Sequence, residues 1–388
     1  MTPAARVQAA IEILDTVQEG VPAEQALTRW ARKSRYAGSG DRAAVRDHVF
    51  SVLRCFRSFA CLGGGDTGRG LMIGLLKSRS EDLDAIFCEL GYAPAPLSDE
   101  ERTAGHSPTT DAERLDVPDW LWPMFQSALK ETAETAAIAL QHRAPVHCRV
   151  NLAKTDIATA IEQLAEDSVT CVVHPTTPTA LIVTDGSRRV RQSSAYQSGL
   201  VELQDAGSQA VVNALPLQDG MRVLDYCAGG GGKALAIAAR AKLDLFAHDV
   251  AEQRMLDLPE RFKRASAEVT ILTPDELPNA ELFDLVLCDA PCSGSGSWRR
   301  APEAKWRLTP ERLQEFGKIQ SEILETAAKL TAPDGVLVYV TCSILNEENV
   351  DSVNRFLAAN SNWKVVYQKT LSVSEETDGF FTTHLGRS

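Results

Sequence analysis

The stretch that decides the fold is Met221–Lys233, MRVLDYCAGGGGK. It reads as a β-strand that enters a turn of four glycines, Gly229, Gly230, Gly231 and Gly232, and residues 234–241 then read as a helix. Glycines at such a turn accept positive φ and let the backbone approach a ligand closely. A further strand is expected at residues 243–247, so the region is predicted to be an α/β fold with a parallel sheet.

Two common phosphate-binding motifs are compared with this turn. A P-loop requires Gly at position 227 and Ser or Thr at position 234, where this chain has Cys227 and Ala234. A dinucleotide-binding motif counted from Gly230 places Leu235, which is too large, at its third glycine position. Counted from Gly229 it places Ala234 there, which is tolerated. The P-loop is therefore excluded, and a dinucleotide site stays open.

Carboxylates follow three of the expected strands. Asp249 follows strand 243–247, Asp275 follows 269–272 and Asp289 follows 283–288. In open α/β sheets ligands bind beyond the carboxyl ends of the strands, where an acid can hold ribose hydroxyls. Such an acid serves NAD enzymes and S-adenosylmethionine enzymes alike, because both ligands contain adenosine.

Two thiols are predicted at the same edge. The segment 283–306, FDLVLCDAPCSGSGSWRRAPEAKW, carries Cys292 after its strand, and strand 336–340 leads into Thr341-Cys342-Ser343. Taken alone, an Asp at a strand end is explained by turn formation, and a Cys is explained by packing in the core. Two parallel strands that each place a thiol at the same edge of the sheet favour a catalytic role for these thiols.

Composition describes an ordinary soluble chain of 388 residues with 44% hydrophobic and 24% charged residues. No stretch is long enough to span a membrane and no signal peptide is visible, so we expect a cytoplasmic protein without a membrane partner. The nine cysteines should be free thiols. Cys288 and Cys292 lack partners at metal-ligand spacing, so no metal is expected.

The distribution of charge and the periodicity of apolar residues divide the chain into regions. Its net charge is -12, but residues 1–97 carry 12 Lys and Arg against 11 Asp and Glu. We expect an all-α bundle at 1–92, a Pro-rich linker at 93–117, a small α+β domain at 118–203 and the α/β domain at 204–388. Few aromatic residues lie in the α+β segment, so no base-stacking platform is visible there.

The motifs DYCAGGGGK (225–233), DAPCSGSG (289–296) and YVTCS (339–343) resemble those of the Sun family of RNA cytosine-C5 methyltransferases, which use S-adenosylmethionine. The resemblance covers residues 118–388. The N-terminal bundle resembles the NusB-like antitermination-factor domain of the bacterial enzymes that methylate small-subunit ribosomal RNA. Further matching positions are Asn151, Gln204-Asp205, Pro302, Lys305-Trp306, Glu348-Asn349 and 378–381.

The resemblance implies a Rossmann-like methyltransferase domain with a seven-stranded, mostly parallel sheet. It also implies catalytic roles: Cys342 adds to C6 of cytosine, Asp289 offsets charge near N3 and N4, and Cys292 assists release. Lys233 could lower the pKa of the thiol, contact the base or form a salt bridge. The cofactor residues implied are Cys227, Ala228, Gly229, Gly230, Gly231, Gly232, Lys233, Asp249, Asp275 and Asp289.

One departure from the family concerns the glycine turn. The family usually has Ala-Pro where this chain has Gly229-Gly230 and Thr where it has Ala234. Replacing Pro by Gly loosens the chain at a cost of about 0.4–1 kcal/mol, so cofactor affinity could fall while the chemistry is kept.

The predicted function is S-adenosylmethionine-dependent methylation of C5 of a cytosine in RNA, with 16S rRNA as the first choice of partner. A tRNA substrate and a non-catalytic RNA-binding or antitermination role are the alternatives. A DNA cytosine methyltransferase is disfavoured, because that family attacks with its Pro-Cys thiol and lacks the Thr-Cys-Ser thiol. We expect a monomer.

Overall fold

The computed structural model describes all 388 residues and divides into two compact units. Unit 1 comprises residues 1–143 and 298–308, and unit 2 comprises residues 144–297 and 309–388. The chain therefore leaves unit 2 after Ser297, contributes eleven residues to unit 1, and returns to unit 2 at Thr309.

Unit 1 is helical, as the apolar periodicity predicts. Its core joins buried residues of α1, α3 and α5, among them Leu14, Val49 and Met72. Side-chain caps begin several helices; the Thr2 hydroxyl, for example, accepts the amide of Ala5 at the start of α1. The helices are α1 (Pro3–Gln18), α2 (Ala23–Lys33), α3 (Ser39–Arg54), α4 (Phe56–Gly63), α5 (Gly68–Ser78), α6 (Leu83–Ile86), α7 (Asp99–Thr103), α8 (Asp111–Arg114), α9 (Trp122–Leu129), α10 (Ala133–Gln141) and α16 (Glu303–Arg307).

The inserted segment 298–308 is built into unit 1. Trp298 and Lys305 are almost fully buried, and the Trp298 ring stacks on Phe125 with centroids 6.1 Å apart. The Trp306 indole donates to the carbonyl of Leu53 at 2.6 Å, and Lys305 Nζ donates to the carbonyl of Arg54 at 3.2 Å. Unit 1 is therefore incomplete without a segment that begins six residues after Cys292.

The segment 93–117, expected to be a linker, contains regular structure, and compact unit 1 extends beyond residue 118. Segment 93–117 contains α7 and α8, and its residues Leu97, Leu115 and Val117 are buried. Residues 118–143 also group with unit 1, so the boundary between the units falls at 143/144. A buried carboxylate accounts for part of this: Asp116 accepts hydrogen bonds from the Ser58 amide at 2.9 Å and from Gln141 Nε2 at 2.8 Å.

The predicted α+β region of unit 2 contains a four-stranded antiparallel sheet in the order β2-β3-β1-β4. Helix α11 packs against it through Ala160 and Leu164. Its elements are β1 (Val146–Val150), α11 (Ile157–Glu166), β2 (Thr170–Val173), β3 (Ala180–Asp185), the 3₁₀ helix η2 (Val190–Gln192), α12 (Ser194–Gln197) and β4 (Val201–Leu203).

A seven-stranded sheet in the order β10-β11-β9-β8-β5-β6-β7 forms the rest of unit 2. The pairs among β9, β8, β5, β6 and β7 are parallel, and only the pairs that include β11 are antiparallel, so the predicted mostly parallel sheet is confirmed. Its elements are α13 (Ala206–Asn213), β5 (Arg222–Asp225), α14 (Gly232–Ala238), β6 (Asp244–Ala247), α15 (Leu258–Ala265), β7 (Thr270–Ile271), β8 (Phe283–Asp289), α17 (Pro310–Leu330), β9 (Thr331–Thr341), α18 (Val350–Ala359), β10 (Trp363–Leu371) and β11 (Phe380–Arg387).

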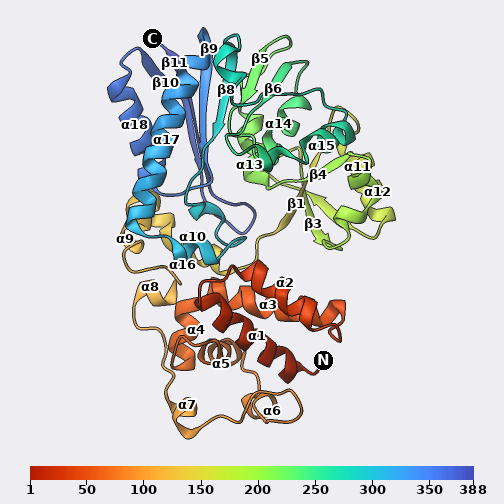
Figure 1. Ribbon diagram of the computed structural model, residues 1–388, viewed down its shortest axis with the longest axis vertical. Helices are drawn as coiled ribbons and strands as arrows, with labels where there is room; N and C mark the ends of the chain where they lie inside the picture. Colours follow the sequence, from red (N-terminus) through yellow and green to blue (C-terminus); the bar gives the residue numbers. More distant parts are fainter. The chain divides into compact units, whose positions relative to one another are not determined.

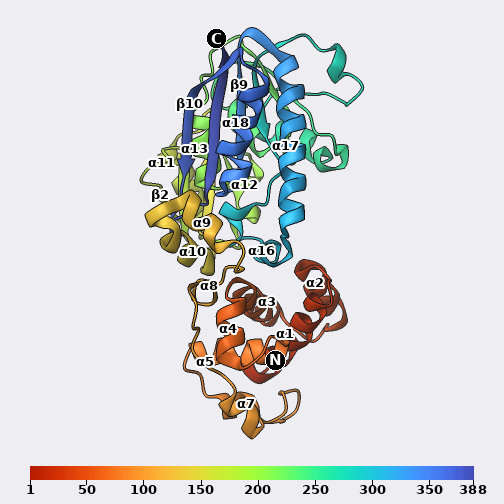
Figure 2. The ribbon, with the colours of Figure 1, turned by 90° about the vertical axis from the view of Figure 1, so that its left-hand side faces the viewer.

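Helices cover both faces of this sheet (Figures 1 and 2). Alternate residues of each strand point to opposite faces. Val286 packs with Leu324 of α17, whereas Leu285 and Leu287 pack with Ile237 of α14. The strands are therefore buried on both sides, which explains why they read as short apolar runs. None of the helices, including the 21-residue α17, has the length and apolar character of a membrane span.

Candidate active site

The glycine turn, residues 229–232, connects β5 to α14 as the sequence predicts. Gly229 has φ +51° and Gly231 has φ +73°, both in the left-handed region. A Cβ on Gly231 would lie 2.3 Å from Leu258 Cδ2, so the Leu258 side chain would have to move to accommodate a larger residue. The turn therefore requires glycine for its conformation, and its backbone can approach a ligand closely.

Asp249 lies directly after β6 and turns its carboxylate toward the glycine turn. It is 2% exposed, and its Oδ2 accepts the Gly229 amide at 2.9 Å while Arg254 Nη1 lies 3.1 Å away. Its Oδ1 accepts the Ala251 amide at 2.9 Å. The structure therefore places the first predicted acid beside the predicted turn.

Arg149 and Gln204 support the glycine turn through hydrogen bonds to its backbone. Arg149 of β1 donates to the carbonyl of Gly232 at 2.8 Å and to Gln204 Oε1 at 2.6 Å. Gln204 Nε2 also donates to the Gly232 carbonyl, at 3.1 Å. Arg149 is buried, and burial lowers the pKa of its guanidinium to about 10. These contacts give Gln204, one of the matching motif positions, a role at the glycine turn although it does not lie at a strand end of the large sheet.

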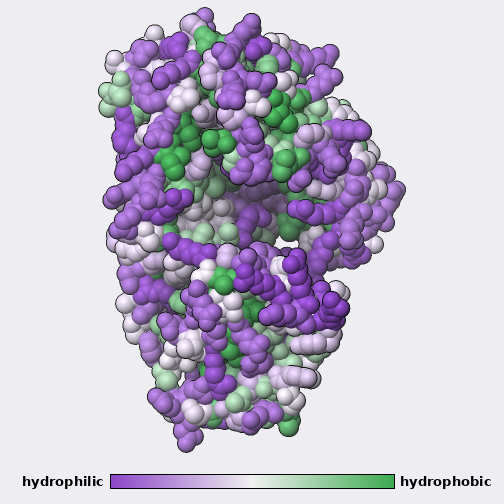
Figure 3. All heavy atoms as spheres, in the orientation of Figure 1, coloured by the Kyte–Doolittle hydropathy of each residue, from purple (hydrophilic) through white to green (hydrophobic).

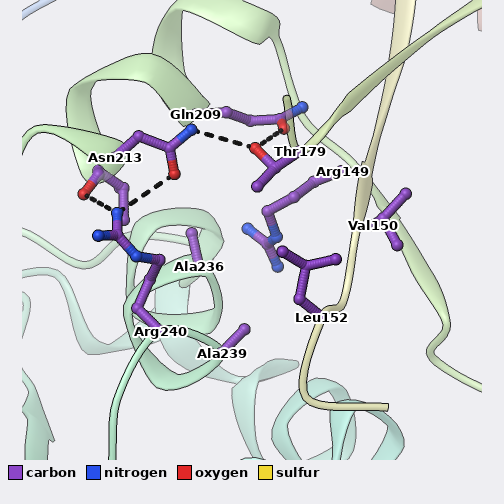
Figure 4. Close-up of a pocket in the computed structure, with 10 residues that line it drawn as sticks. Arg149, Val150, Leu152, Thr179, Gln209, Asn213, Ala236, Ala239 and Arg240 are labelled. Carbon is purple, nitrogen blue, oxygen red and sulfur yellow. Dashed lines mark hydrogen bonds between the residues drawn. The ribbon is translucent and has the colours of Figure 1, made fainter. Parts of the chain in front are cut away.

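A small cavity of about 20 Å³ lies where β1 meets α13 and α14 (Figure 4). Gln209 Oε1 accepts the Thr179 hydroxyl at 2.8 Å, and Asn213 Nδ2 donates to the same hydroxyl at 3.2 Å. Arg240 donates to Asn213 Oδ1 at 3.3 Å. The volume suits about one water molecule, so this cavity is part of the packing between the α+β region and the large sheet.

Lys233 and Asp289 form an ion pair at the centre of the site. Lys233 Nζ lies 2.5 Å from Asp289 Oδ2, with the Lys233 side chain 8% exposed and that of Asp289 33% exposed. Burial alone lowers the pKa of the ammonium, but the Asp289 carboxylate outweighs it and raises that pKa above its ordinary value. Lys233 is therefore a fixed positive charge, and Asp289 keeps an exposed edge for a ligand.

Cys292 and Cys342 meet at the end of the paired strands β8 and β9. Asp289 pairs with Val340 in the parallel ladder, and the Ala290 amide continues it to the Val340 carbonyl at 2.9 Å. The two Sγ atoms lie 3.5 Å apart, which is hydrogen-bond distance for sulfur. The structure therefore confirms that both thiols reach one edge of the sheet.

The two thiols have opposite pKa shifts. The hydrogen bond from Cys292 lowers the pKa of Cys342, and Lys233 lowers it further, against burial and the nearby Asp289. The same hydrogen bond, together with burial, raises the pKa of Cys292 well above its ordinary value. These directions favour Cys342 as the thiol of the pair that ionises more readily.

Glu348 holds the two thiol loops together. We call residues 290–297 the β8 loop and residues 342–345 the β9 loop. Glu348 is fully buried; its Oε1 accepts the Ser293 amide at 2.7 Å and Gln320 Nε2 at 3.2 Å. Its Oε2 accepts the hydroxyls of Ser293 and Ser343, both at 2.5 Å. Each serine directly follows a site cysteine, so one carboxylate fixes the position of both thiols.

Backbone contacts also join the two loops to the C-terminal motif 378–381. The Gly296 amide donates to the Cys342 carbonyl, and the Gly379 amide donates to the Gly296 carbonyl, both at 2.9 Å. A Cβ on Gly296 would lie 2.3 Å from the Gly379 carbonyl oxygen, so the close approach requires glycine. The motif residues are therefore assembled around the thiols in space.

The remaining predicted residues differ in their surroundings. Cys227 lies next to the glycine turn, and burial raises the pKa of its thiol well above the ordinary value. The Ala228 amide donates to the His248 carbonyl at 2.8 Å, which links β5 to β6. Asp275 is exposed in the turn after β7. The structure thus shows direct contacts between Gly229 and Asp249, between Lys233 and Asp289 and between Cys292 and Cys342, and it leaves Asp275 in an exposed turn.

The sequence reasoning missed Asp225, the last residue of β5. Its carboxyl group is 1% exposed, and burial raises its pKa to about 7. No side chain bonds to either carboxyl oxygen, and the nearby Ala234 amide lowers the pKa only in part. A buried polar group without a side-chain partner beside a glycine cradle fits a site for a polar ligand such as an adenosine cofactor. Its place at the end of a strand, two residues before Cys227, was the available signal.

Comparisons with known proteins match this architecture. Residues 212–385 match the family described as 16S rRNA methyltransferase RsmB/F, and residues 117–190 match its ferredoxin-like domain. The ribosomal RNA small subunit methyltransferase B of Citrobacter koseri is 30% identical over 331 residues, which cover 82% of this chain and 73% of that protein. The Vibrio vulnificus protein of the same name is 32% identical, with 68% of this chain and 65% of that protein covered.

Solved structures show the same fold. The crystal structure of PH0851 superposes with a TM-score of 0.77 and 24% identity, covering 100% of this chain and 99% of that one. NSun6 from Pyrococcus horikoshii superposes with a TM-score of 0.61 and 17% identity, covering 70% of this chain and 98% of that one.

The α/β sheet, the glycine turn and the strand-end acids define a Rossmann-like methyltransferase. Within that class, the chain belongs to the RsmB/F family of 16S rRNA methyltransferases. It spans slightly less than two thirds of the length of the Vibrio vulnificus relative.

Proposed function

We propose that this protein transfers a methyl group from S-adenosylmethionine to C5 of a cytosine in 16S rRNA through a covalent bond to Cys342. The observation that supports this most strongly is the pair of thiols 3.5 Å apart, of which only Cys342 has a lowered pKa. A structural pair of thiols has no need of a lysine and a carboxylate within the same cluster.

The glycine turn, Asp249 and Asp289 are proposed to hold the cofactor, with Asp225 and Cys227 beneath it. Asp249 already accepts a backbone amide of the turn at 2.9 Å, so ribose hydroxyls can replace or share that contact. When bound, the cofactor supplies an electrophilic methyl group. Asp275 stands in an exposed turn, and we propose for it a weaker, outer contact to the adenine.

The proposed reaction begins at Cys342. Its thiolate forms a bond to C6 of the base, and the electron pair of the C5–C6 bond moves into the ring, which makes C5 nucleophilic. The Lys233 ammonium can pass a proton to the Asp289 carboxylate beside it, and the protonated Asp289 then donates to N3 and offsets the negative charge that develops toward N3 and N4. After methylation, a water molecule takes the C5 proton, the electron pair of the C5–H bond re-forms the C5=C6 double bond, and the C6–S bond breaks with its electron pair returning to the sulfur of Cys342.

Cys292 is proposed to assist this last step. Its thiol lies within hydrogen-bond distance of the sulfur that leaves, and its raised pKa keeps it protonated near neutral pH. A hydrogen bond to the departing thiolate stabilises it and favours release. Loss of Cys292 should therefore slow release more than attack.

The target cytosine must be unstacked to reach the two thiols, which favours loops and single strands of RNA. We propose that unit 1 contributes RNA binding rather than chemistry, because every group of the thiol cluster lies in unit 2. We also propose that the protein acts as a monomer.

Methyl transfer from labelled S-adenosylmethionine tests the proposal. The purified protein should label 16S rRNA, with much less label on tRNA and none on DNA. Bisulfite sequencing of 16S rRNA from cells with and without the gene then identifies the cytosine. Label on DNA or no label on any RNA would refute the proposed activity, and preferential label on tRNA would move the substrate to that class.

A further inference from the structure

Unit 1 exposes two tyrosines that stack on each other. The Tyr36 and Tyr92 side chains are 70% and 81% exposed, and their rings lie 6.5 Å apart between centroids and 16° from parallel. Leu90 beside them is 76% exposed. The two loops are more than fifty residues apart in sequence, so the fold itself brings these aromatic faces together.

A cavity of about 380 Å³ adjoins these rings. Its lining includes Trp30, Tyr36, Leu90 and Tyr92 together with residues of α1, among them Gln8 and Glu12. This volume lies within the usual range for small-molecule sites, about 300–1,000 Å³. The lining thus combines aromatic and apolar side chains with polar groups, which suits a planar ring with polar edges.

Four exposed cations lie close to Trp30 and Tyr36 in the sequence. Arg29, Arg32, Lys33 and Arg35 are all exposed and alternate along the chain with Trp30 and Tyr36. The salt bridges of unit 1 use other cations, such as Arg6, Arg46, Arg57 and Arg69. In Figure 3 strongly hydrophilic side chains cover the end of unit 1 that carries α2. A chain with a net charge of -12 therefore presents an unneutralised basic cluster at this place.

We propose that these residues, here called the Tyr36 surface (Arg29, Trp30, Arg32, Lys33, Arg35, Tyr36, Leu90 and Tyr92), bind unpaired nucleotides of RNA. A base stacks on the tyrosines and the backbone phosphates lie on the cations, which is how single strands are bound without strong sequence preference. Glu12 repels phosphate from the cavity but can accept a hydrogen bond from an exocyclic amino group of a base. The inference rests on the proposed RNA methylation and assigns RNA binding to particular residues of unit 1.

Fluorescence anisotropy with a labelled 12-nucleotide RNA of mixed sequence and the full-length protein tests the proposal. The double variant Tyr36→Ala/Tyr92→Ala should weaken binding at least about tenfold, because stacking contributes about 1–3 kcal/mol per base. Tyr36→Phe/Tyr92→Phe keeps the ring faces and should bind like the parent. The double variant Arg32→Gln/Lys33→Gln should reduce the salt dependence of log Kd by about 0.7 per cation removed.

A matched control removes two exposed lysines of β10, Lys364→Gln/Lys369→Gln, and should leave affinity and salt dependence unchanged. Unchanged binding by the Tyr→Ala pair, or equal loss in the Tyr→Phe pair, would overturn the proposal, as would equal affinity for a duplex of the same sequence. Thermal unfolding of each variant excludes misfolding.

Methyl transfer separates this inference from the proposed function. Normal methylation by a Tyr→Ala variant whose RNA affinity is unchanged would refute the inference alone. A parent protein that binds the oligonucleotide through these residues but methylates no RNA would refute the proposed function alone. A raised KM with unchanged kcat in the Tyr→Ala variant would support both.

Discussion

The β8 loop and the β9 loop share the same local design, but their thiols differ. Each follows a parallel strand of the sheet, and each places a serine after its cysteine that bonds to Glu348. The pKa of Cys342 is nevertheless lowered and that of Cys292 is raised, because one thiol donates to the other and Lys233 favours the charge on Cys342. The sequence motifs supply two candidate nucleophiles, and the tertiary neighbours of the two thiols are the basis on which we propose Cys342.

Removing the proposed nucleophile should have the largest effect. Cys342→Ala leaves no sulfur to attack C6, so methyl transfer to RNA should fall by at least about four orders of magnitude. Cofactor affinity measured by calorimetry should stay unchanged, since the glycine turn is untouched. Residual activity close to the parent would mean that the two loops do not differ in the way proposed.

Removing the Glu348 carboxylate, which accepts hydrogen bonds from both loops, tests the two loops at once. Glu348→Ala leaves four buried donors without their acceptor, so both thiols should shift and kcat should fall about 100-fold, the scale for misplacement by about 1 Å. Glu348→Gln keeps an acceptor oxygen and should lose less. Asp334→Ala, on the exposed part of β9, is the control and should keep the parent rate. A Glu348→Ala enzyme with parent kcat would show that the loops hold their positions without it.

A substitution outside the β8 loop and the β9 loop should leave the difference between the pKa values of Cys292 and Cys342 unchanged. Asp249→Ala removes a charged hydrogen-bond acceptor and should weaken S-adenosylmethionine binding by about 1.5–3 kcal/mol. Asp275→Ala should cost about 0.5–1.5 kcal/mol, because an exposed group competes with water. Calorimetry measures both. A larger loss for Asp275 than for Asp249 would reverse the proposed order of the two acids.

The smallest expected effect concerns pH. Because the Cys342 pKa lies below the ordinary 9.0, the acidic limb of kcat/KM should have its midpoint below that value, with activity lost as pH falls and the thiolate is protonated. Lys233→Gln removes a cation that lowers this pKa, so the midpoint should move to higher pH. A midpoint that stays in place or moves down would show that Lys233 does not act on the thiol.

The layout of the large sheet was predictable from the sequence. Strands buried on both faces read as apolar runs, and the turn of Gly229 to Gly232 has few alternatives once the P-loop is excluded. The strand ends then place Asp249, Asp289, Cys292 and Cys342 at one edge without further information. Because these strands are parallel, the residues that follow them in the sequence could be predicted to lie together in the structure.

Contacts across long sequence separations were not predictable. Nothing local indicates that Arg149 reaches the Gly232 carbonyl, that Glu348 bonds to Ser293, or that Trp298 and Lys305 are buried in unit 1. The segment 93–117 reads as a linker because its buried residues, such as Leu97 and Val117, lack a period. Aromatic content alone also misses Tyr36 and Tyr92, which only the fold brings into contact.

Denaturing electrophoresis of protein–RNA adducts tests the central claim most directly. After incubation with S-adenosylmethionine and 16S rRNA, Cys292→Ala should accumulate as a covalent adduct, because attack by Cys342 proceeds while release is slowed. Cys342→Ala and the double variant should form none. An adduct in Cys342→Ala that is absent in Cys292→Ala would contradict the account, because Cys292 would then be the nucleophile.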